Sequence, residues 1–348
     1  MLKFSKLFAA AALAASALVA TAPAQAAAGD AQNPVKVFYY SLNDLFINQL
    51  SASLQDRALA NHIKLAQYDA NDDLMRQISQ IQAALSINRD HTPILVNPVD
   101  TQNGTAALRA ARKAKVPVIF FNRKPSDEAL KSYRDAWYVG TKPASSAYYQ
   151  AEIVFDYYKA HPDMDKNKDG ALSYVMLKGE AGHQDTSARS NGFTRTLLDQ
   201  GMKLKPLASD NANWSQSAAQ NKMAGIIDKV GINNIEVVVA NNDAMALGAI
   251  LALQAEGYNL PDAQDKSKFI PVVGIDGLPA ALDAVERGTM IGTVFNDYNS
   301  TADVMVRITT AYLNGEVITE DLLGYPIENQ TVYIPYVKVT NDNIGSLR

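Results

Sequence analysis

Short runs of β-branched and aromatic residues alternate with longer amphipathic segments along most of this chain. The runs that read as strands span residues 35–40, 63–68, 93–96, 116–121, 172–177, 235–240, 269–275 and 291–295. Between them, apolar residues recur at helical spacing, as at Leu74, Ile78, Ile81 and Leu85. Such alternation predicts an α/β fold with parallel sheets and helices on both faces, because a helix that links two parallel strands packs back onto the sheet.

The first residues have the composition of an export signal. Lys3 and Lys6 supply positive charge, residues 7–20 form a short Ala-rich apolar core, and Ala24-Gln25-Ala26 resembles a cleavage site. We predict a signal peptide over residues 1–26, cleaved after Ala26 or within the next two residues, and a periplasmic location for the mature chain. The alternative is a membrane anchor, although the apolar run is short for a membrane span.

Cysteine content and charge narrow the possible partners. The chain has no cysteine, so it would carry neither disulfides nor the lipid-acceptor cysteine of a lipoprotein. Its formal net charge is -4, with Lys and Arg scattered along the sequence. No nucleic-acid-binding surface is indicated. We expect a soluble monomer after export.

Removal of the signal leaves about 320 residues, enough for two domains of ordinary size. Long connections of mixed composition fall near residues 138–143, 296–300 and 330–334. Three crossings there would make both domains discontinuous and hinge them around a cleft. We expect one lobe from residues 29–141 plus 296–333 and the other from 142–295 plus 334–348, although a single sheet with long insertions would give a similar pattern.

Polar residues follow most of the predicted strands. In open parallel sheets, ligands bind at the carboxyl ends of the strands. The residues found there are Asp44, Phe46, Asn97, His183, Asp185, Asn242, Asp276 and Asn296, with Arg189 four residues after Asp185. Asp accepts hydroxyl protons, Asn donates and accepts, and Arg offers a planar fork. This collection suits a neutral, hydroxyl-rich ligand.

Two aromatic residues could cover the apolar faces of a sugar ring, namely Phe46 and Trp214. Each candidate also has a purely structural interpretation. The aromatic rings could belong to the core, and aspartates that follow strands often cap helices. Asp185 and Arg189 have the spacing of an ordinary ion pair on the surface of a helix. His183, taken alone, fits a structural role as well as a functional one.

Residues 165–173 are spaced like a calcium-binding loop. Oxygen-bearing side chains stand at positions one, three, five and nine, a glycine stands at position six, and Ala171 would offer its backbone carbonyl. Position twelve is Met176, whose thioether cannot supply the usual bidentate carboxylate. The missing ligand must therefore come from elsewhere in the chain. Acidic turns can imitate such a loop when the last ligand is absent.

Sequence signatures of common enzymes are missing. We find no phosphate-binding loop, no Gly-x-Ser-x-Gly motif and no His-Glu-x-x-His motif. The four histidines are too dispersed for a zinc site. Asp44, Asp185 and Asp276 could still provide a pair of carboxylates for sugar hydrolysis, so an exported glycosidase stays an alternative.

Four segments together resemble the type I periplasmic sugar-binding protein family, and within it the proteins that bind D-galactose and D-glucose. They are residues 165–173, 177–185, 236–245 and 274–279, and the likeness extends over the whole mature chain. The resemblance implies two parallel-sheet α/β domains joined by a three-segment hinge, with no enzymatic activity. It also implies delivery of the sugar to an ABC importer and, in some members, to a chemotaxis receptor.

The resemblance further implies a role for individual residues. The sugar-binding set would be Asp44, Phe46, Asn97, His183, Asp185, Arg189, Trp214, Asn242, Asp276 and Asn296. A structural calcium ion would be bound by Asp165, Asn167, Asp169, Ala171, Ser173 and Glu236, with Glu236 as the bidentate ligand. Ser173 replaces the family's glutamine and could reach the ion through water. A sugar-responsive DNA-binding regulator has the same ligand fold, but the predicted export signal argues against it.

Overall fold

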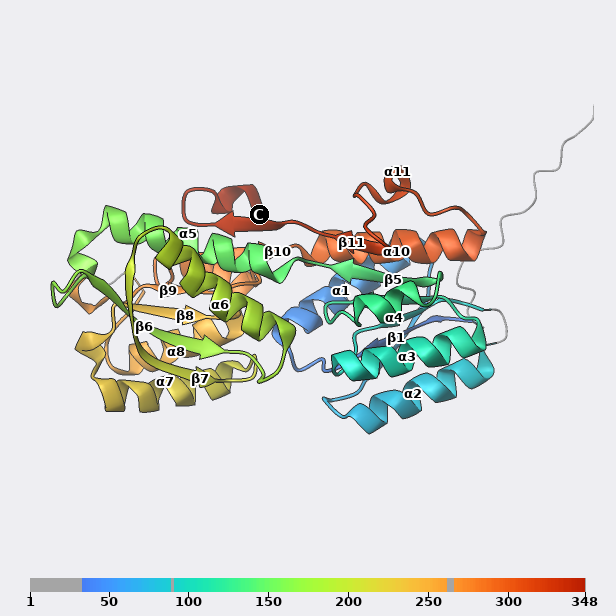
Figure 1. Cartoon of the computed structure of the whole chain (residues 1–348), viewed down its shortest axis with the longest axis horizontal. Helices are drawn as coiled ribbons and strands as arrows, with labels where there is room; N and C mark the ends of the chain where they lie inside the picture. The colour runs from blue at the N-terminus through green and yellow to red at the C-terminus, as the bar shows by residue number, and fades with distance from the viewer. Residues whose placement is uncertain (1–32, 89–90, 262–265, 348) are drawn as a thin grey trace, which may run out of the picture.

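The computed structural model describes residues 33–88, 91–261 and 266–347. The predicted signal peptide, residues 1–26, lies outside the described residues. The chain folds into two α/β lobes that lie end to end along the long axis of the molecule (Figure 1). Within the described ranges, no helix is both long and apolar enough to span a membrane.

The first lobe is built on a six-stranded parallel sheet with the order β11-β5-β4-β3-β1-β2. Its strands are β1 (Val35–Tyr39), β2 (Leu65–Asp69), β3 (Ile94–Val96), β4 (Val118–Phe121), β5 (Ala136–Gly140) and β11 (Thr331–Tyr333). Its helices are α1 (Leu45–Ala60), α2 (Leu74–Ile87), α3 (Thr101–Ala114), α4 (Asp127–Lys131), α10 (Tyr298–Asn314) and α11 (Glu320–Leu323). The central strands β1, β3 and β4 are buried throughout, as expected for strands covered on both faces.

The second lobe contains a four-stranded parallel sheet with the order β7-β6-β8-β9. Its strands are β6 (Ala171–Lys178), β7 (Lys203–Asn211), β8 (Val237–Ala240) and β9 (Val272–Val273), and the antiparallel pair β10 (Thr293–Asn296) and β12 (Tyr336–Val339) lies beside β9 through isolated bridges. Its helices are α5 (Pro143–Ala160), α6 (Gln184–Asp199), α7 (Gln216–Val230), α8 (Asp243–Ala255) and α9 (Pro279–Glu286). Short 3₁₀ turns occur at Pro162–Met164, Ile232–Asn234, Lys266–Lys268 and Ile344–Leu347.

The chain passes between the two lobes three times, after β5, after β10 and after β11. Two of the expected connections, near 138–143 and 330–334, are partly strand, because β11 pairs with β5 from Thr331 opposite Tyr138. The partner strand lies almost two hundred residues away in the sequence, so local composition does not reveal it. The sequence also missed β7, an edge strand that carries lysines and Pro206 and has a register shift opposite Tyr174.

The parallel strands of both lobes end at the boundary between the lobes. Helices that follow these strands begin with side-chain caps from Asp44 on α1, His183 on α6 and Asn242 on α8. The Asn242 side chain does so by accepting the Met245 N–H at 3.0 Å. The polar ends of the two sheets thus face each other across the cleft.

Candidate functional site

A small cavity of about 30 Å³ lies between the lobes, at the carboxyl ends of both sheets. It is lined by Tyr40, Asp44, Phe46, Asn122 and Arg123 of the first lobe and by His183, Asp185, Arg189, Trp214, Asn242 and Asp276 of the second. All the residues predicted for sugar binding except Asn97 and Asn296 are in this lining. A ligand here would be held from both sides by the two lobes.

Asn97 and Asn296 are outside the cavity lining but contact residues that belong to it. Asn97 is fully buried, and its side-chain amide donates to the side chain of Asn122 at 3.2 Å. Asn296 is also buried, and its backbone N–H donates to the carbonyl of Asp276 at 3.0 Å. Both residues therefore hold neighbours that line the cavity.

Sequence reasoning missed three lining residues, Tyr40, Asn122 and Arg123. Asn122 directly follows β4, so the search for polar residues at strand ends could have found it. Its φ of 59° is in the left-handed region, which asparagine tolerates better than most residues. Arg123 gave no local signal, because only its tertiary contacts place it in the cleft.

Asp44 combines a structural role with its position in the cavity. One carboxylate oxygen accepts hydrogen bonds from the backbone N–H groups of Phe46 at 2.8 Å and Ile47 at 3.0 Å, which caps α1. The other oxygen accepts from the Tyr40 hydroxyl at 2.5 Å. The carboxylate is thus fixed in place, and its remaining lone pairs can accept protons from a ligand.

Asp185 and Arg189 form a buried ion pair at 3.2 Å, with side-chain exposures of 9% and 5%. A solvated surface pair is therefore excluded. Arg189 also donates to the Asn241 carbonyl at 2.7 Å and to the Tyr336 hydroxyl at 3.1 Å. Burial alone would lower the pKa of Arg189, but Tyr336 and Asp185 raise it above its usual value. The guanidinium is therefore a permanent cation in this wall of the cavity.

Two polar atoms of the Asp185–Arg189 ion pair are not used in hydrogen bonds to the described part of the chain. Within the described part of the chain, Asp185 Oδ1 and Arg189 Nε are buried and have no hydrogen-bond partner. One is an acceptor and the other is a donor. Because leaving buried polar groups unpaired is costly, these atoms favour a hydroxyl-bearing ligand beside them.

His183 is a neutral imidazole in this structure. Its Nδ1 accepts the backbone N–H of Asp185 at 3.0 Å, which places the ring proton on Nε2. Burial lowers the pKa of His183 to about 4, with smaller contributions from Arg123 and Arg189. The ring also meets Trp214 edge to face, with centroids 5.1 Å apart.

Asp276 has an unusual backbone conformation at the floor of the cavity. Its φ is 128°, a region that side-chain-bearing residues rarely adopt. The adjoining turn is held by Asp243, which accepts the Leu278 N–H at 2.9 Å and the Thr293 hydroxyl at 2.7 Å. Burial raises the pKa of Asp276 well above its usual value, and nearby Arg189 partly offsets this.

The two predicted aromatic residues come from opposite lobes. Phe46 is buried and packs edge to face against Tyr298, with centroids 6.5 Å apart. Trp214 is 8% exposed and lies over Gly179, where a Cβ atom would come within 2.1 Å of the indole ring. Glycine is therefore required for Trp214 to reach this position. The pair can provide apolar walls for a sugar ring.

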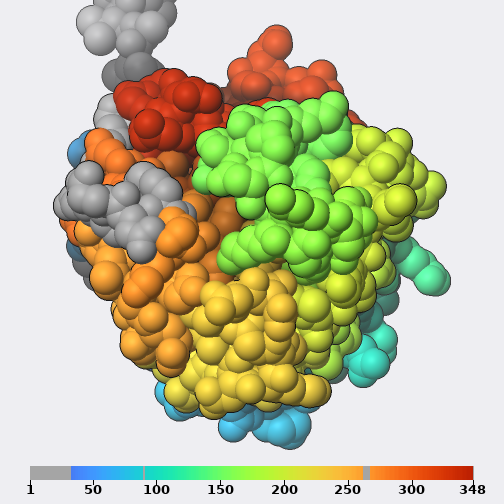
Figure 2. All heavy atoms as spheres, turned by 90° about the vertical axis from the view of Figure 1, so that its left-hand side faces the viewer, coloured from blue at the N-terminus to red at the C-terminus, as the bar shows by residue number. Residues whose placement is uncertain are grey.

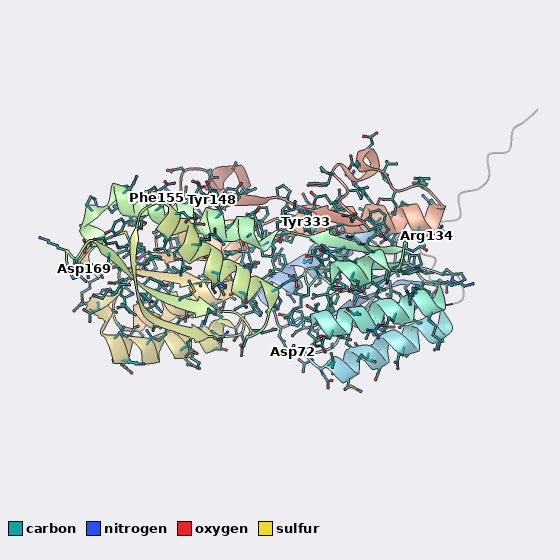
Figure 3. The ribbon with its side chains drawn as sticks, viewed as in Figure 1. Asp72, Arg134, Tyr148, Phe155, Asp169 and Tyr333 are labelled. Carbon is teal, nitrogen blue, oxygen red and sulfur yellow. The ribbon has the colours of Figure 1, made fainter. Side chains whose placement is uncertain are left out.

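The calcium-like loop, residues 165–173, lies at the end of the second lobe far from the cleft, as the position of Asp169 shows (Figure 3). Asp165 accepts the N–H groups of Asp169 and Gly170, and Asn167 also accepts from Asp169. In the described residues, no three His, Cys, Asp or Glu side chains gather as a ready metal site. The loop has the turn of a calcium site, but its carboxylates contact backbone groups.

The Glu236 carboxylate contacts both ends of this loop. Its two oxygens accept the N–H groups of Lys166 at 3.0 Å and Ser173 at 2.6 Å. Burial raises the pKa of Glu236, and the nearby Asp165 and Asp169 carboxylates add to this effect. Ser173 Oγ, among the described side chains, is buried without a hydrogen-bond partner. Carboxylate, amide, hydroxyl and carbonyl oxygens are the donors that calcium prefers, so these residues fit the ion in kind.

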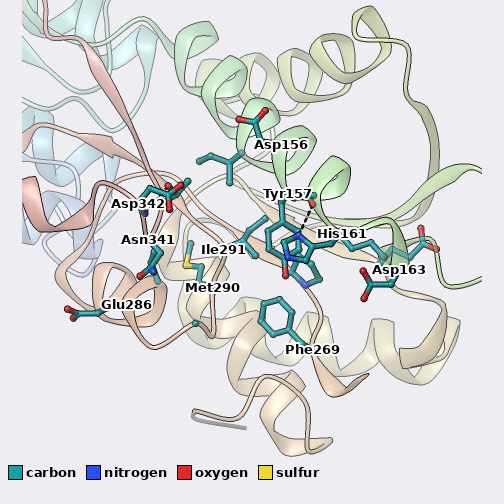
Figure 4. A pocket seen from close by; sticks show the side chains of 18 of the residues that line it. Asp156, Tyr157, His161, Asp163, Phe269, Glu286, Met290, Ile291, Asn341 and Asp342 are labelled. Atoms are coloured by element: carbon teal, nitrogen blue, oxygen red, sulfur yellow. Dashed lines mark hydrogen bonds between the residues drawn. The ribbon is translucent and has the colours of Figure 1, made fainter. Parts of the chain in front are cut away.

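A second, larger cavity of about 1030 Å³ lies elsewhere in the second lobe. Figure 2 shows this face hollowed where α5, the residues around α9 and the C-terminal segment meet. Figure 4 shows Tyr157, His161 and Phe269 in its lining. The rings of Tyr157 and His161 are stacked, with centroids 4.0 Å apart. None of the predicted sugar-site residues lines this cavity. We therefore place the candidate site between the lobes.

Comparison with known proteins identifies related sequences over nearly the full length. Residues 35–317 match the model of the periplasmic binding protein domain family. A D-galactose/methyl-galactoside binding periplasmic protein of Haemophilus influenzae is 32% identical over 316 residues, which cover 90% of this chain and 92% of that protein. A xylitol-binding protein of Mycolicibacterium smegmatis is 28% identical over 87% of this chain and 79% of its own length.

Solved structures show the same architecture. An ABC transporter solute binding protein from Bacillus halodurans with bound myo-inositol has a TM-score of 0.72 and 26% identity, and the match covers 90% of this chain and 96% of that one. A periplasmic solute binding protein from Actinobacillus succinogenes with bound D-allose has a TM-score of 0.74 at 20% identity, covering 90% and 99%. The second likeness, at such low identity, concerns the fold alone.

Proposed function

This chain belongs to the periplasmic binding protein domain family, and on that premise we propose that it captures D-galactose and D-glucose between its lobes. We further propose that it is exported to the periplasm and delivers the sugar to an ABC importer in the inner membrane. The Haemophilus influenzae relative, named for D-galactose and methyl-galactoside binding, supports this class of ligand. The resemblance also implies a chemotaxis receptor as a second partner, which a chemotaxis assay with galactose would test.

The buried polar atoms of the cleft are the observation that carries this proposal. Asp185 Oδ1 and Arg189 Nε are buried next to the cavity without a partner in the described part of the chain. A hydroxyl group can accept from one and donate to the other at the same time. A sugar would thus satisfy groups that the protein by itself leaves unpaired.

The remaining walls suit a pyranose. Phe46 and Trp214 can cover its C–H faces, while Asp44, Asn122 and Asn242 can bind hydroxyl groups around its edge. The contacts come from both lobes, so full binding requires the lobes to close on the ligand. Galactose and glucose differ only at the 4-hydroxyl, and a carboxylate such as Asp44 can accept a proton from either epimer.

A titration with a panel of ligands distinguishes D-galactose and D-glucose from the ligands of related proteins. Relatives are described with xylitol, myo-inositol and D-allose, so these compounds belong beside galactose, glucose and ribose in a calorimetric titration. We expect galactose and glucose to bind and the other compounds to bind far more weakly. Tight binding of a polyol alone would overturn the hexose assignment.

A separate activity assay tests the alternative of a glycosidase. Of the three candidate carboxyl groups, Asp185 is paired with Arg189 at 3.2 Å, and Asp44 caps α1 and accepts from the Tyr40 hydroxyl. Burial raises the pKa of Asp276, but a hydrolase needs a second, uncommitted carboxylate beside the acid. We therefore expect no release of aglycone from aryl galactosides. Release at a measurable rate would support the glycosidase instead.

We also propose a structural calcium ion bound by Asp165, Asn167, Asp169, the Ala171 carbonyl and Glu236, with Ser173 as a direct or water-mediated ligand. The oxygen-rich donor set and the buried, unpartnered Ser173 hydroxyl support this role. Binding would tie the loop to the start of β8 and stabilise the second lobe. Direct measurement of bound metal in the purified protein, by emission spectroscopy after dialysis, tests it.

A further inference from the structure

Arg123 and Glu180 form an ion pair across the boundary between the two lobes. Arg123 follows β4 of the first lobe and Glu180 follows β6 of the second. Arg123 Nη2 lies 2.7 Å from Glu180 Oε1, with side-chain exposures of 6% for the arginine and 28% for the glutamate. This ion pair joins the two lobes directly in the arrangement that the structure describes.

The arginine is held firmly on its own lobe. Its guanidinium carbon lies 3.6 Å from the centre of the Tyr40 ring, a stacking contact that favours arginine over lysine. Its Nη1 donates to the carbonyl of Val99. With this orientation set by the first lobe alone, Nη2 is aimed at the second lobe.

Arg123 also contributes to the lining of the sugar site. Arg123 is part of the cavity lining beside Asn122, and its Nε is buried without a hydrogen-bond partner within the described residues. A ligand hydroxyl in the cavity is a suitable acceptor for this N–H. One guanidinium can therefore bind its own lobe, the ligand and the opposite lobe together.

We propose that Arg123 is the positioning residue that couples sugar binding to lobe closure through Glu180. This inference rests on the proposed function of the cleft. Charges around Glu180 explain why the arginine is needed: Asp44 and Asp72 of the first lobe both raise the pKa of Glu180, beyond the larger effect of its burial. Without Arg123, closure would bring Glu180 towards these two carboxylates, and the lobes would repel each other.

This charge arrangement predicts a distinctive pattern in a double-mutant cycle. Arg123→Ala leaves Glu180 facing Asp44 and Asp72, so galactose affinity should fall by about tenfold or more. Glu180→Gln removes both the attraction and the repulsion, and should cost less. The double variant Arg123→Ala, Glu180→Gln should bind more tightly than Arg123→Ala alone, because the repulsion has been removed.

The cycle is measured by calorimetry with galactose and glucose, and small-angle scattering follows closure at saturating sugar. Arg123→Lys, which keeps the charge but loses the planar fork, should give an intermediate affinity. Arg307→Ala breaks an exposed ion pair with Asp303 at 2.8 Å on α10 and is the matched control with unchanged affinity. Arg123→Ala and the double variant lose the same buried side chain, so their melting temperatures without sugar should be similar, which separates closure from general stability.

Additive losses, with no recovery in the double variant, would overturn the coupling through Glu180. Wild-type affinity in Arg123→Lys and Arg123→Ala would exclude the arginine from closure altogether. These results differ from a failure of the proposed function, in which the wild-type protein itself would bind neither galactose nor glucose.

Discussion

The side-chain amide of Asn97 donates a hydrogen bond to the side-chain oxygen of Asn122 at 3.2 Å. The two residues end the neighbouring strands β3 and β4, and Asn122 lines the cavity while Asn97 is outside its lining. Asn97 thus orients a residue of the cavity lining, while its own Oδ1 is buried without a hydrogen-bond partner among the described residues.

This arrangement predicts different effects of two alanine substitutions. Asn122→Ala removes a hydrogen-bonding side chain from the cavity lining, so on the proposed function galactose affinity should fall by about 1–3 kcal/mol. Asn97→Ala should weaken binding less and should also lower stability, because Asn97 is fully buried. Calorimetry and thermal melting measure the two effects, and a larger loss of affinity in Asn97→Ala would reverse the assignment.

On the proposal that Asp44 is the shared acceptor of the 4-hydroxyl, Asp44→Ala should weaken galactose and glucose together, by about 1–3 kcal/mol or more. The variant also loses the cap of α1, which costs about 0.5–2 kcal/mol of stability. Asp73→Ala is the matched control, since Asp73 caps α2 by accepting the Arg76 N–H at 3.0 Å. Loss of one epimer alone would show that Asp44 is not the shared acceptor.

Removal of calcium should destabilise the protein and leave sugar affinity unchanged, because the loop is far from the cleft. Calcium at a hundred times its dissociation constant would add about 2.7 kcal/mol of stability. Chelation should therefore lower the melting temperature, and Asp169→Ala should abolish that response. Asp163→Ala, just before the loop and outside the expected ligand set, should keep it. An unchanged melting temperature in chelator would refute the ion.

His183 predicts a loss of stability in mild acid. Its pKa is lowered to about 4 in the folded protein, mainly by burial, so the unfolded chain binds the proton first as the pH falls. The free energy of unfolding should therefore decrease between pH about 6.5, the unfolded value, and pH 4. The loss should be about 1–3 kcal/mol. Denaturant titrations of the wild type and His183→Gln test this, and equal pH slopes in the two proteins would contradict it.

The strand and helix pattern made the fold class predictable because it depends on local residue preferences. The sequence pattern predicts buried strands such as β8, with the sequence Val-Val-Val-Ala, and amphipathic helices such as α2. Strands β5, β7, β11 and β12 were missed, since they are edge strands or pair across a long stretch of sequence. Tertiary pairing decided those elements.

For the candidate site, the sequence by itself determined which chemistry was available, because polar residues after parallel strands meet at the same edge of a sheet. Only the tertiary structure decided which of them face the cavity. It joined Asn97 to Asn122 by a hydrogen bond, brought Glu236 beside the calcium-like loop and paired Arg123 with Glu180. These relationships join residues 25 to 70 positions apart, and their geometry depends on how whole lobes pack, which local sequence does not specify.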